Sequence, residues 1–173
     1  MKKTKGFTLI ELMVTIAILA VVVGIAAPNM GMFITRQKVS SQSSELATTL
    51  AAARAEAART NQDIVVIPAA DNTNGWASGW CFGPTAIDNC SHAAVIKIFG
   101  NIDADQVEIS SPYRQSSNRL TFRRDGTLLN SIGAQAFKVT SSKLKSSSTD
   151  ARCIQLNKLG KTNINKVAPN ANC

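Results

Sequence analysis

The sequence predicts an α+β protein in which one long N-terminal helix leads into an all-β, antiparallel, two-sheet globular head with two disulfides. Three features of the 173 residues support this prediction. Residues 7–28 are almost entirely apolar, residues 29–60 repeat small and apolar side chains at helical spacing, and residues 61–173 alternate short apolar runs with turn-forming segments. The length suits one domain with an appendage.

The first element is an apolar helix over residues 7–28, preceded by the lysine-rich residues 1–6. Such a helix spans about one hydrocarbon thickness of a bilayer. The basic flank should stay on the cytoplasmic side, which places the bulk of the chain outside. Three interpretations remain open: a secretory signal cut near residues 24–27, a plain single-span anchor, and a cut between Gly6 and Phe7.

Glu11 separates these interpretations, because a carboxylate inside an apolar run is costly and is usually there for function. A cut after Gly6 would free an amine at Phe7, which is a natural partner for that carboxylate. The pairing is more useful between neighbouring subunits. There it neutralises two charges in apolar surroundings and sets the register of packed helices.

Residues 5–12, Lys-Gly-Phe-Thr-Leu-Ile-Glu-Leu, resemble the prepilin signature of type IV pilins and type II secretion pseudopilins. The resemblance implies that residues 1–6 are a prepilin leader, removed after Gly6 by a prepilin peptidase that also N-methylates Phe7. It implies a Gram-negative protein that crosses the inner membrane once, with a periplasmic head, and is then extracted into an extracellular pilus. In that filament, residues 7–28 would lie in the core and Glu11 would serve assembly.

Residues 29–60 are expected to form an amphipathic helix packed on the head. One stripe of small and apolar side chains recurs at alternating steps of four and three residues, and its sequence neighbours are polar. Pro28 lacks a backbone donor and should kink or loosen the helix where the two segments join. The stripe favours core packing over a cofactor site, and it comprises Val39, Ser43, Leu46, Leu50, Ala53 and Ala57.

Residues 61–173 are expected to form the β-rich head, with hairpin turns at residues 124–126 and 157–161. Residues 141–149 are rich in Ser and Lys and should form an exposed loop. The expected strands cover residues 64–67, 80–82, 95–99, 107–109, 119–123, 127–130, 137–140, 153–156 and 162–164.

This head resembles the GspH/FimT branch of the pilin family, which includes FimU-type minor pilins. Residues 120–128 are similar to the central hairpin of that branch. Residues 152–156, followed by Gly160 and Lys161, are similar to its C-terminal hairpin. Because major pilins of this class usually have one sheet with a C-terminal disulfide loop, the extra strands favour a minor subunit.

The four cysteines, Cys81, Cys90, Cys153 and Cys173, form an even set in an exported head, which suggests two disulfides. Three pairings are possible. We favour Cys81–Cys90 with Cys153–Cys173, because this pairing closes short loops. The rival is a metal site that joins the first two cysteines to His92, but it lacks the tight cysteine spacing of zinc modules.

The motifs predict no enzyme, cofactor or metal. The single histidine, His92, has no recognisable nucleophile partner, and the chain has no phosphate loop and no zinc-peptidase motif. Asp103, Asp105 and Glu108 form an acidic cluster that favours a solvated turn over a calcium site.

Charge is divided unevenly along the head. Residues 61–113 carry six acidic side chains and one basic one, whereas residues 114–173 carry eleven basic and two acidic ones. The basic part is a candidate surface for an acidic partner or for a polyanion, and a solvated basic face is the plain alternative.

The resemblance adds a DNA hypothesis, because some FimT-like pilins bind DNA through a basic tail with a Gly-Arg-x-Arg segment. Residues 160–163 here read Gly-Lys-Thr-Asn, so one basic position is kept, as a lysine that cannot form a bidentate phosphate contact. The candidate residues for binding double-stranded DNA or a partner are Arg152, Lys158, Lys161 and Lys166, with Lys143 and Lys145 in the preceding loop.

The sequence therefore predicts a minor type IV pilin of a tip or priming complex. Its partners would be other minor pilins and the major pilin, and its outputs would be twitching motility, adhesion and DNA uptake. Two alternatives remain open: a DNA-binding minor pilin for natural transformation, and a type II secretion pseudopilin.

Overall fold

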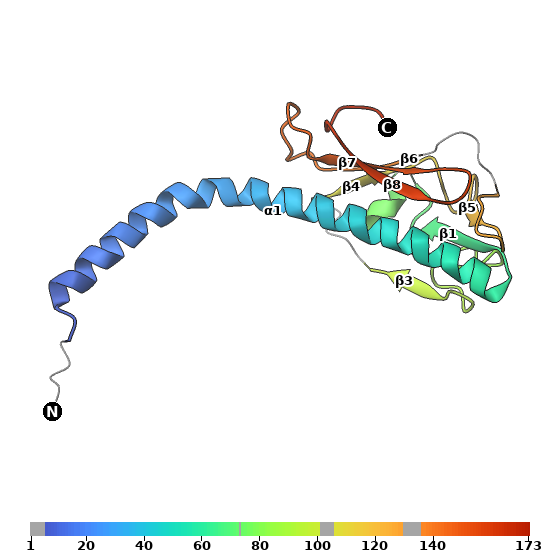
Figure 1. Ribbon diagram of the computed structural model, residues 1–173, viewed down its shortest axis with the longest axis horizontal. Helices are drawn as coiled ribbons and strands as arrows, with labels where there is room; N and C mark the ends of the chain where they lie inside the picture. The colour runs from blue at the N-terminus through green and yellow to red at the C-terminus, as the bar shows by residue number, and fades with distance from the viewer. Residues whose placement is uncertain (1–5, 73, 101–105, 130–135) are drawn as a thin grey trace. The chain divides into compact units, whose positions relative to one another are not determined.

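The computed structural model describes residues 6–72, 74–100, 106–129 and 136–173, with the backbone alone at residues 25–29 and 136. The chain forms two compact units, Met1–Ile34 and Thr35–Cys173. The elements, shown in Figure 1, are the helix α1 (Leu9–Thr60), the strand β1 (Ile64–Pro68), the short 3-10 helix η1 (Gly75–Ser78), and the strands β2 (Trp80–Pro84), β3 (Lys97–Phe99), β4 (Glu108–Ser110), β5 (Leu120–Phe122), β6 (Ala136–Thr140), β7 (Ala151–Leu156) and β8 (Thr162–Val167).

In the described part of the first unit, residues 9–34 are helical and the apolar side chains that precede residue 24 face solvent. The large apolar side chains of residues 7–23 are between 50% and 80% exposed. α1 continues through Pro28 as one helix, so the proline does not end it. Among the described residues, no helix is long and apolar enough to cross a membrane. The span predicted over residues 7–28 includes positions described by their backbone alone.

The first of two antiparallel sheets in the head has the strand order β3-β2-β1-β5. Its strand β1 is buried on both faces, as its run of isoleucine and valine suggests. Alternate β1 residues face the main core and a smaller cluster that contains Cys81 and Ile87. The disulfide between Cys81 and Cys90 joins β2 to the loop that carries Ile87. The loop therefore supplies the apolar cover for this outer face.

The second antiparallel sheet has the strand order β4-β6-β7-β8. β8 lies at its edge and most of its side chains are exposed. A disulfide joins Cys153 on β7 to Cys173, with 5.7 Å between their Cα atoms, and so fastens the C-terminal tail to the sheet. Together with Cys81–Cys90, this bond confirms the cysteine pairing that short loops favoured.

The core of the head joins the C-terminal half of α1 to both sheets. All six positions of the predicted helical stripe are at most 1% exposed, which confirms that the stripe is core. Both tryptophans are buried with their polar atoms bonded. Trp80 Nε1 donates to Thr49 Oγ1 over 3.1 Å, and Trp76 Nε1 donates to the Tyr113 carbonyl over 2.9 Å. These bonds satisfy polar groups that burial would otherwise leave unpaired.

Two of the predicted strands differ from the structure. Residues 127–130 were expected as a strand, but their described part makes one isolated bridge, between Leu128 and Phe122, and Asn130 lies outside the described residues. The predicted hairpin turn is nevertheless present, because Arg123 N donates to the Thr127 carbonyl and Leu129 N donates to the Thr121 carbonyl. Between these bonds, Leu128 N donates to the carbonyl of Lys158 in the turn between β7 and β8. The expected strand at residues 95–99 shortens to β3, because Val95 belongs to the small cluster under the disulfide loop.

Candidate functional site

The N-terminal motif places an exposed peptide bond just before α1. Gly6, Phe7 and Thr8 precede the first helical residue, and the Phe7 side chain is 80% exposed. The bond between Gly6 and Phe7 is therefore outside the helical hydrogen-bond ladder. This is the accessible backbone geometry that a processing peptidase requires.

Glu11 takes part in a capping box with Thr8. Thr8 N and Thr8 Oγ1 each donate to Glu11 Oε2 over 3.0 Å, and Glu11 N donates to Thr8 Oγ1 over 3.3 Å. These reciprocal bonds satisfy backbone donors that the first helical turn leaves free. The carboxylate thus has a local partner within one chain, and its Oε1 accepts none of these bonds. Sequence reasoning missed Thr8, although Thr-x-x-Glu before an apolar run is a capping signal.

Two hairpin turns, one from each sheet, meet beside α1. Gly126 and Gly160 both adopt positive φ angles, 79° and 73°, which favour glycine. A Cβ built on Gly160 would lie 2.5 Å from the Gly126 carbonyl oxygen. That same oxygen accepts a hydrogen bond from Arg54 Nε of α1 over 3.0 Å. The two segments that resemble family hairpins therefore form one three-way junction, and Arg54 was not predicted to take part in it.

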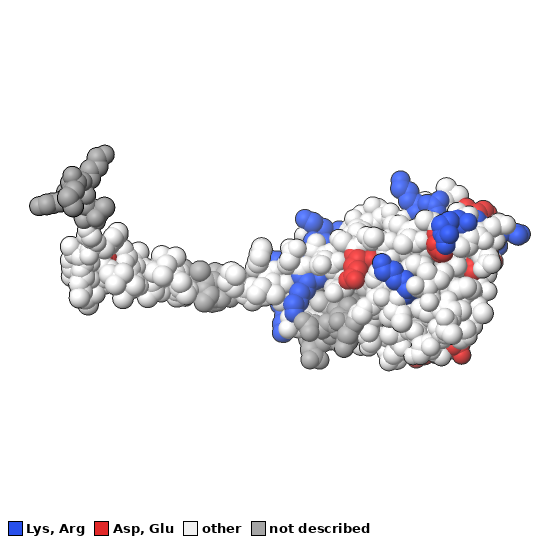
Figure 2. Space-filling view, turned by 90° about the horizontal axis from the view of Figure 1, so that it is seen from below, with Lys and Arg blue, Asp and Glu red and all other residues white. Residues whose placement is uncertain are grey.

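The four candidate DNA-binding residues occupy opposite ends of the β7–β8 hairpin. Lys158 and Lys161 lie at its turn, whereas Arg152 and Lys166 are cross-strand partners at its open end. At strand spacing, residues 161 and 166 are about 16 Å apart. Figure 2 shows Lys and Arg scattered among Asp and Glu on the face in view. The structure thus gives two pairs of basic residues in place of one patch.

Arg152 differs from the three lysines in having its guanidinium engaged by the protein. Its Nη1 lies within hydrogen-bond distance of three backbone carbonyls, those of Thr149, Asp150 and Ala151, with the shortest distance 2.9 Å. Lys158, Lys161 and Lys166 are exposed. The lysines are consequently better placed than Arg152 to meet an external anion.

The loop at residues 141–150 carries the other two candidate lysines. Leu144 is only 7% exposed and belongs to the main core, whereas Lys143 and Lys145 on either side of it are exposed. At the end of the loop, Arg36 Nε donates to Asp150 Oδ2 over 2.8 Å, and this ion pair joins the loop to α1. The predicted exposed loop is therefore held at two points.

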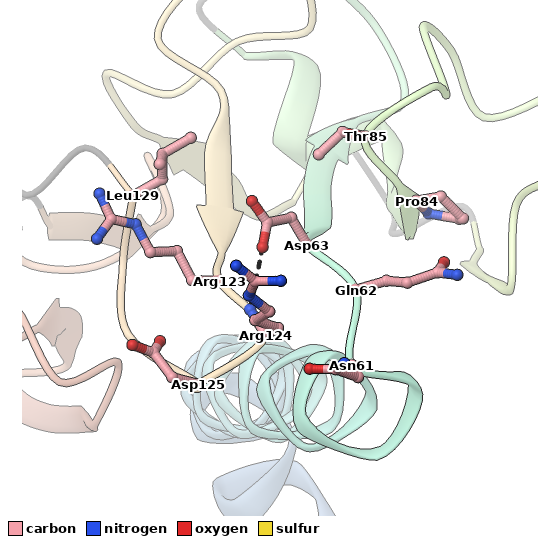
Figure 3. Close-up of a pocket in the computed structure, with 9 residues that line it drawn as sticks. All are labelled: Asn61, Gln62, Asp63, Pro84, Thr85, Arg123, Arg124, Asp125 and Leu129. Carbon is pink, nitrogen blue, oxygen red and sulfur yellow. Dashed lines mark hydrogen bonds between the residues drawn. The ribbon is translucent and has the colours of Figure 1, made fainter.

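A polar pocket of about 700 Å³ lies where α1 ends (Figure 3). Arg123 and Arg124 line it together with Asp63 and Asp125. Asp63 Oδ1 accepts a hydrogen bond from the Arg124 backbone N–H over 3.0 Å, which ties β1 to the turn after β5. The two carboxylates balance the two guanidinium charges, so the pocket has no net preference for an anion.

The described residues bring no three His, Cys, Asp or Glu side chains together as metal ligands. Cys81 and Cys90 are bonded to each other, and His92 Nδ1 accepts a hydrogen bond from the Ala94 backbone N–H over 3.1 Å. Asp103 and Asp105 of the predicted acidic cluster lie outside the described residues.

Family models match both parts of the chain. The model described as "Type II transport protein GspH" matches residues 42–160, and the "Prokaryotic N-terminal methylation motif" matches residues 1–27. The first match contains both hairpins of the junction, and the second contains the proposed cleavage site. Among curated protein sequences, none matches this chain.

The fold is similar to that of the type IV minor pilin FimU of Pseudomonas aeruginosa, solved in two crystal forms. For the P21 form, the TM-score is 0.60 at 23% identity, over 80% of this chain and 98% of that chain. For the P65 form, the TM-score is 0.57 at 21% identity, over 76% of this chain and 98% of that chain. Identity at this level shows a shared fold.

Proposed function

Because this chain belongs to the GspH family of type IV pilin-like proteins, we propose that it is a minor pilin that helps to prime and assemble a type IV pilus. Its role is structural. The leader, residues 1–6, is removed after Gly6, and the new amino terminus at Phe7 is methylated by a prepilin peptidase. Before assembly, residues 7–28 anchor the subunit in the inner membrane, with the head in the periplasm.

The observation that carries this proposal is the combination of an exposed apolar helix with one carboxylate near its start. Between residues 7 and 23 the large apolar side chains are at least half exposed. Burying them requires lipid or other helices, and a filament core supplies such helices. There Glu11 exchanges its contacts with Thr8 for the amino terminus of a neighbouring subunit.

Replacing Glu11 tests the role of the carboxylate in assembly. Glu11→Val should leave the subunit in the membrane but lower its incorporation into pili by about tenfold or more, because a neighbour's buried amine loses its partner. Immunoblots of sheared pili and of membranes, in a strain that lacks the native gene, would measure both pools. Equal amounts of the variant and the native subunit in pili would contradict the proposal.

Thr8→Ala is the matched control, because it removes the capping hydroxyl and keeps the carboxylate. It should weaken the helix start by about 1 kcal/mol. It should leave incorporation close to that of the native chain. If it reduced incorporation as much as Glu11→Val does, helix capping would explain Glu11.

A type II secretion pseudopilin is the second candidate, favoured by the description of the matching family model. A pseudopilus would bury the apolar helix and pair Glu11 in the same way, so Glu11→Val does not distinguish the two systems. Deletion of the gene does: loss of surface pili with normal protein secretion supports the pilus, and the reverse supports the secretion system. The FimU likeness supports the pilus as the first choice.

Direct DNA binding for natural transformation stays a prediction of the sequence. The structure engages Arg152 with backbone carbonyls, so that of the four candidates only Lys158, Lys161 and Lys166 are exposed to meet phosphates. The geometry therefore supports the assembly role better than it supports a DNA-uptake receptor.

A further inference from the structure

The edge strand β8 turns one side of its backbone away from the sheet. Asn157 N donates to the Lys161 carbonyl over 3.1 Å, so these two residues form a hydrogen-bonded pair at the base of the β7–β8 turn. Hydrogen-bonded and non-hydrogen-bonded pairs alternate along an antiparallel ladder, and the register of β7 and β8 runs without a break. The backbone N–H and C=O groups of Thr162, Ile164 and Lys166 therefore point away from β7.

These outward backbone groups have no hydrogen-bond partner among the residues that the structure describes. Ile164 and Lys166 are exposed, and the strand contains no proline. Unpaired N–H and C=O groups along an exposed edge form a template on which another strand can add. β8 thus offers one donor and one acceptor to a further strand at each of these alternate residues.

Hollows adjoin the start of β8 on both faces of its sheet. The first, called the alanine hollow below, has a volume of about 500 Å³ and lies between α1 and the β7–β8 turn. Its lining includes Ala51, Ala55, Ala58, Gly160, Lys161 and Thr162. The second, called the outer hollow, has a volume of about 360 Å³ and is lined by Gln155, Asn163 and their neighbours in the hairpin.

The two hollows fit the alternation of side chains along an added strand. Thr162 lies opposite Leu156 of the main core, so the alanine hollow is on the core face, which α1 covers. Asn163 lies opposite Gln155 on the other face, where Asn165 Nδ2 donates to Gln155 Oε1 over 3.4 Å. Because successive side chains of a strand point to opposite faces, an added strand would place neighbouring side chains in the two hollows.

The charges along β8 indicate what kind of strand fits this edge. Residues 151–173 carry four basic side chains and no acidic one. Asp125, which also lines the alanine hollow, already accepts hydrogen bonds from the backbone N–H and the hydroxyl of Thr127. Antiparallel pairing of two copies of β8 would bring Lys161 of one copy beside Lys166 of the other, and like charges so placed are destabilising. A strand with carboxylates at these positions would instead pair with both lysines.

We propose that β8 binds an extended segment of a different protein chain, which adds to the second sheet at its free edge. Backbone hydrogen bonds hold the segment, an apolar side chain enters the alanine hollow, and carboxylates meet Lys161 and Lys166. The inference goes beyond the proposed function, because strand addition requires neither a membrane nor a filament.

A library of random peptides of about ten residues, displayed on phage and selected on the full-length chain in detergent, is the probe. We expect peptides rich in β-branched residues, with Asp or Glu about five positions apart. Ile164→Pro removes one outward N–H and keeps the pairing with β7, so it should weaken peptide binding by about tenfold or more. Ile164→Ala keeps the N–H and is the matched control. Failure to select any peptide, or equal binding to the two variants, would overturn the inference.

Amide hydrogen exchange, measured by NMR, distinguishes strand addition from other modes of docking. In the free chain the N–H of Ile164 should exchange faster than those of Asn163 and Asn165, which point towards β7. A bound peptide should slow exchange at Ile164 by about tenfold or more and leave Asn165 nearly unchanged. An Ile164 amide that is protected in the free chain, or that the peptide does not protect, would contradict strand addition.

Filling the alanine hollow tests the proposed seat of the apolar side chain. Ala55→Leu should weaken binding of the selected peptides by about tenfold, because the new side chain occupies the hollow. Ala52→Leu makes the same change at an exposed position of α1 outside the lining, and should have no effect. Equal effects of the two variants would overturn the assignment of the hollow.

Charge reversal tests the choice of partner. Lys161→Glu with Lys166→Glu should weaken binding of the selected acidic peptides by about tenfold, whereas Lys143→Glu with Lys145→Glu should not. Equal losses would mean that general charge draws the peptides, and would overturn the inference. Dimers of the chain that form without peptide and dissociate in the Ile164→Pro variant would identify a second copy as the occupant, and would overturn it as well.

Discussion

The two parts of α1 are both rich in apolar and small residues, yet they meet opposite surroundings. Residues 7–23 expose their large apolar side chains by at least half, whereas Val39, Leu46 and Leu50 in the second part are fully buried. Both parts belong to the same helix. The hydrophobicity of a helical segment therefore does not indicate whether the surface that packs against it belongs to the same chain.

The difference lies in what the rest of the chain provides. Two sheets and both tryptophans cover one stripe of the second part, and polar side chains occupy the opposite side. The first part is apolar all round, apart from Glu11 and two threonines, so no single sheet would cover it. Its partners must surround it, as lipid or a bundle of identical segments does. The predictions below test this division.

The largest expected effect comes from truncating one leucine in each part. Leu50→Ala should lower the free energy of unfolding of the head by about 2–5 kcal/mol, because it leaves a cavity in the core. Leu19→Ala should leave that free energy unchanged, because Leu19 is 62% exposed. Tryptophan fluorescence during urea unfolding in detergent reports the head alone, since Trp76 and Trp80 are both there. Similar losses for the two variants would break the comparison.

A smaller effect is expected from a matched pair of glycines. Gly160→Ala puts a side chain at φ +73° and against the Gly126 carbonyl, and should cost about 1–3 kcal/mol. Gly24→Ala meets nothing within 4 Å and should leave unfolding of the head unchanged. The same urea titration measures both. An unchanged midpoint for Gly160→Ala would mean that the three-way junction is not rigid.

The smallest effect is the acid sensitivity of the head. The hydroxyl of Ser116 lowers the pKa of Asp71, and the hydroxyl and backbone N–H of Thr127 lower the pKa of Asp125. Because the pKa of each carboxyl is depressed by folding, its contribution to stability is present above its ordinary value near 3.8 and is lost as the pH falls through the folded pKa.

We would measure the free energy of unfolding of the native chain and of the Asp71→Asn, Asp125→Asn double variant at pH 7 and at pH 3. The difference between the two proteins gives the contribution of the two carboxylates to stability. The variant should be less stable than the native chain at pH 7, and the gap should narrow at pH 3. Glu45→Gln, which removes the same charge from an exposed helical position, is the control. A gap that stays the same at both values would contradict the assignment.

Much of the fold follows from local patterns. The helical stripe, most strands, the turn at residues 157–161 and the cysteine pairing all match the structure, because side-chain periodicity, glycine in turns and short loop closure act over few residues. Residues 127–129 pair with β5 across the predicted turn at residues 124–126, but Leu128 N also donates to the carbonyl of Lys158, thirty positions away. A pattern within one hairpin carries no signal for such a contact.

The sequence by itself determined the family, the apolar helix with its single carboxylate, and the set of candidate basic residues. Only the tertiary structure decided which of those residues act together. It divided the basic set between two ends of one hairpin, engaged Arg152 with backbone carbonyls, and joined Arg54 to Gly126, 72 residues away. The physical reason is that a helix or a turn is stabilised by neighbours in the chain. A surface is assembled by packing between segments that the sequence keeps far apart.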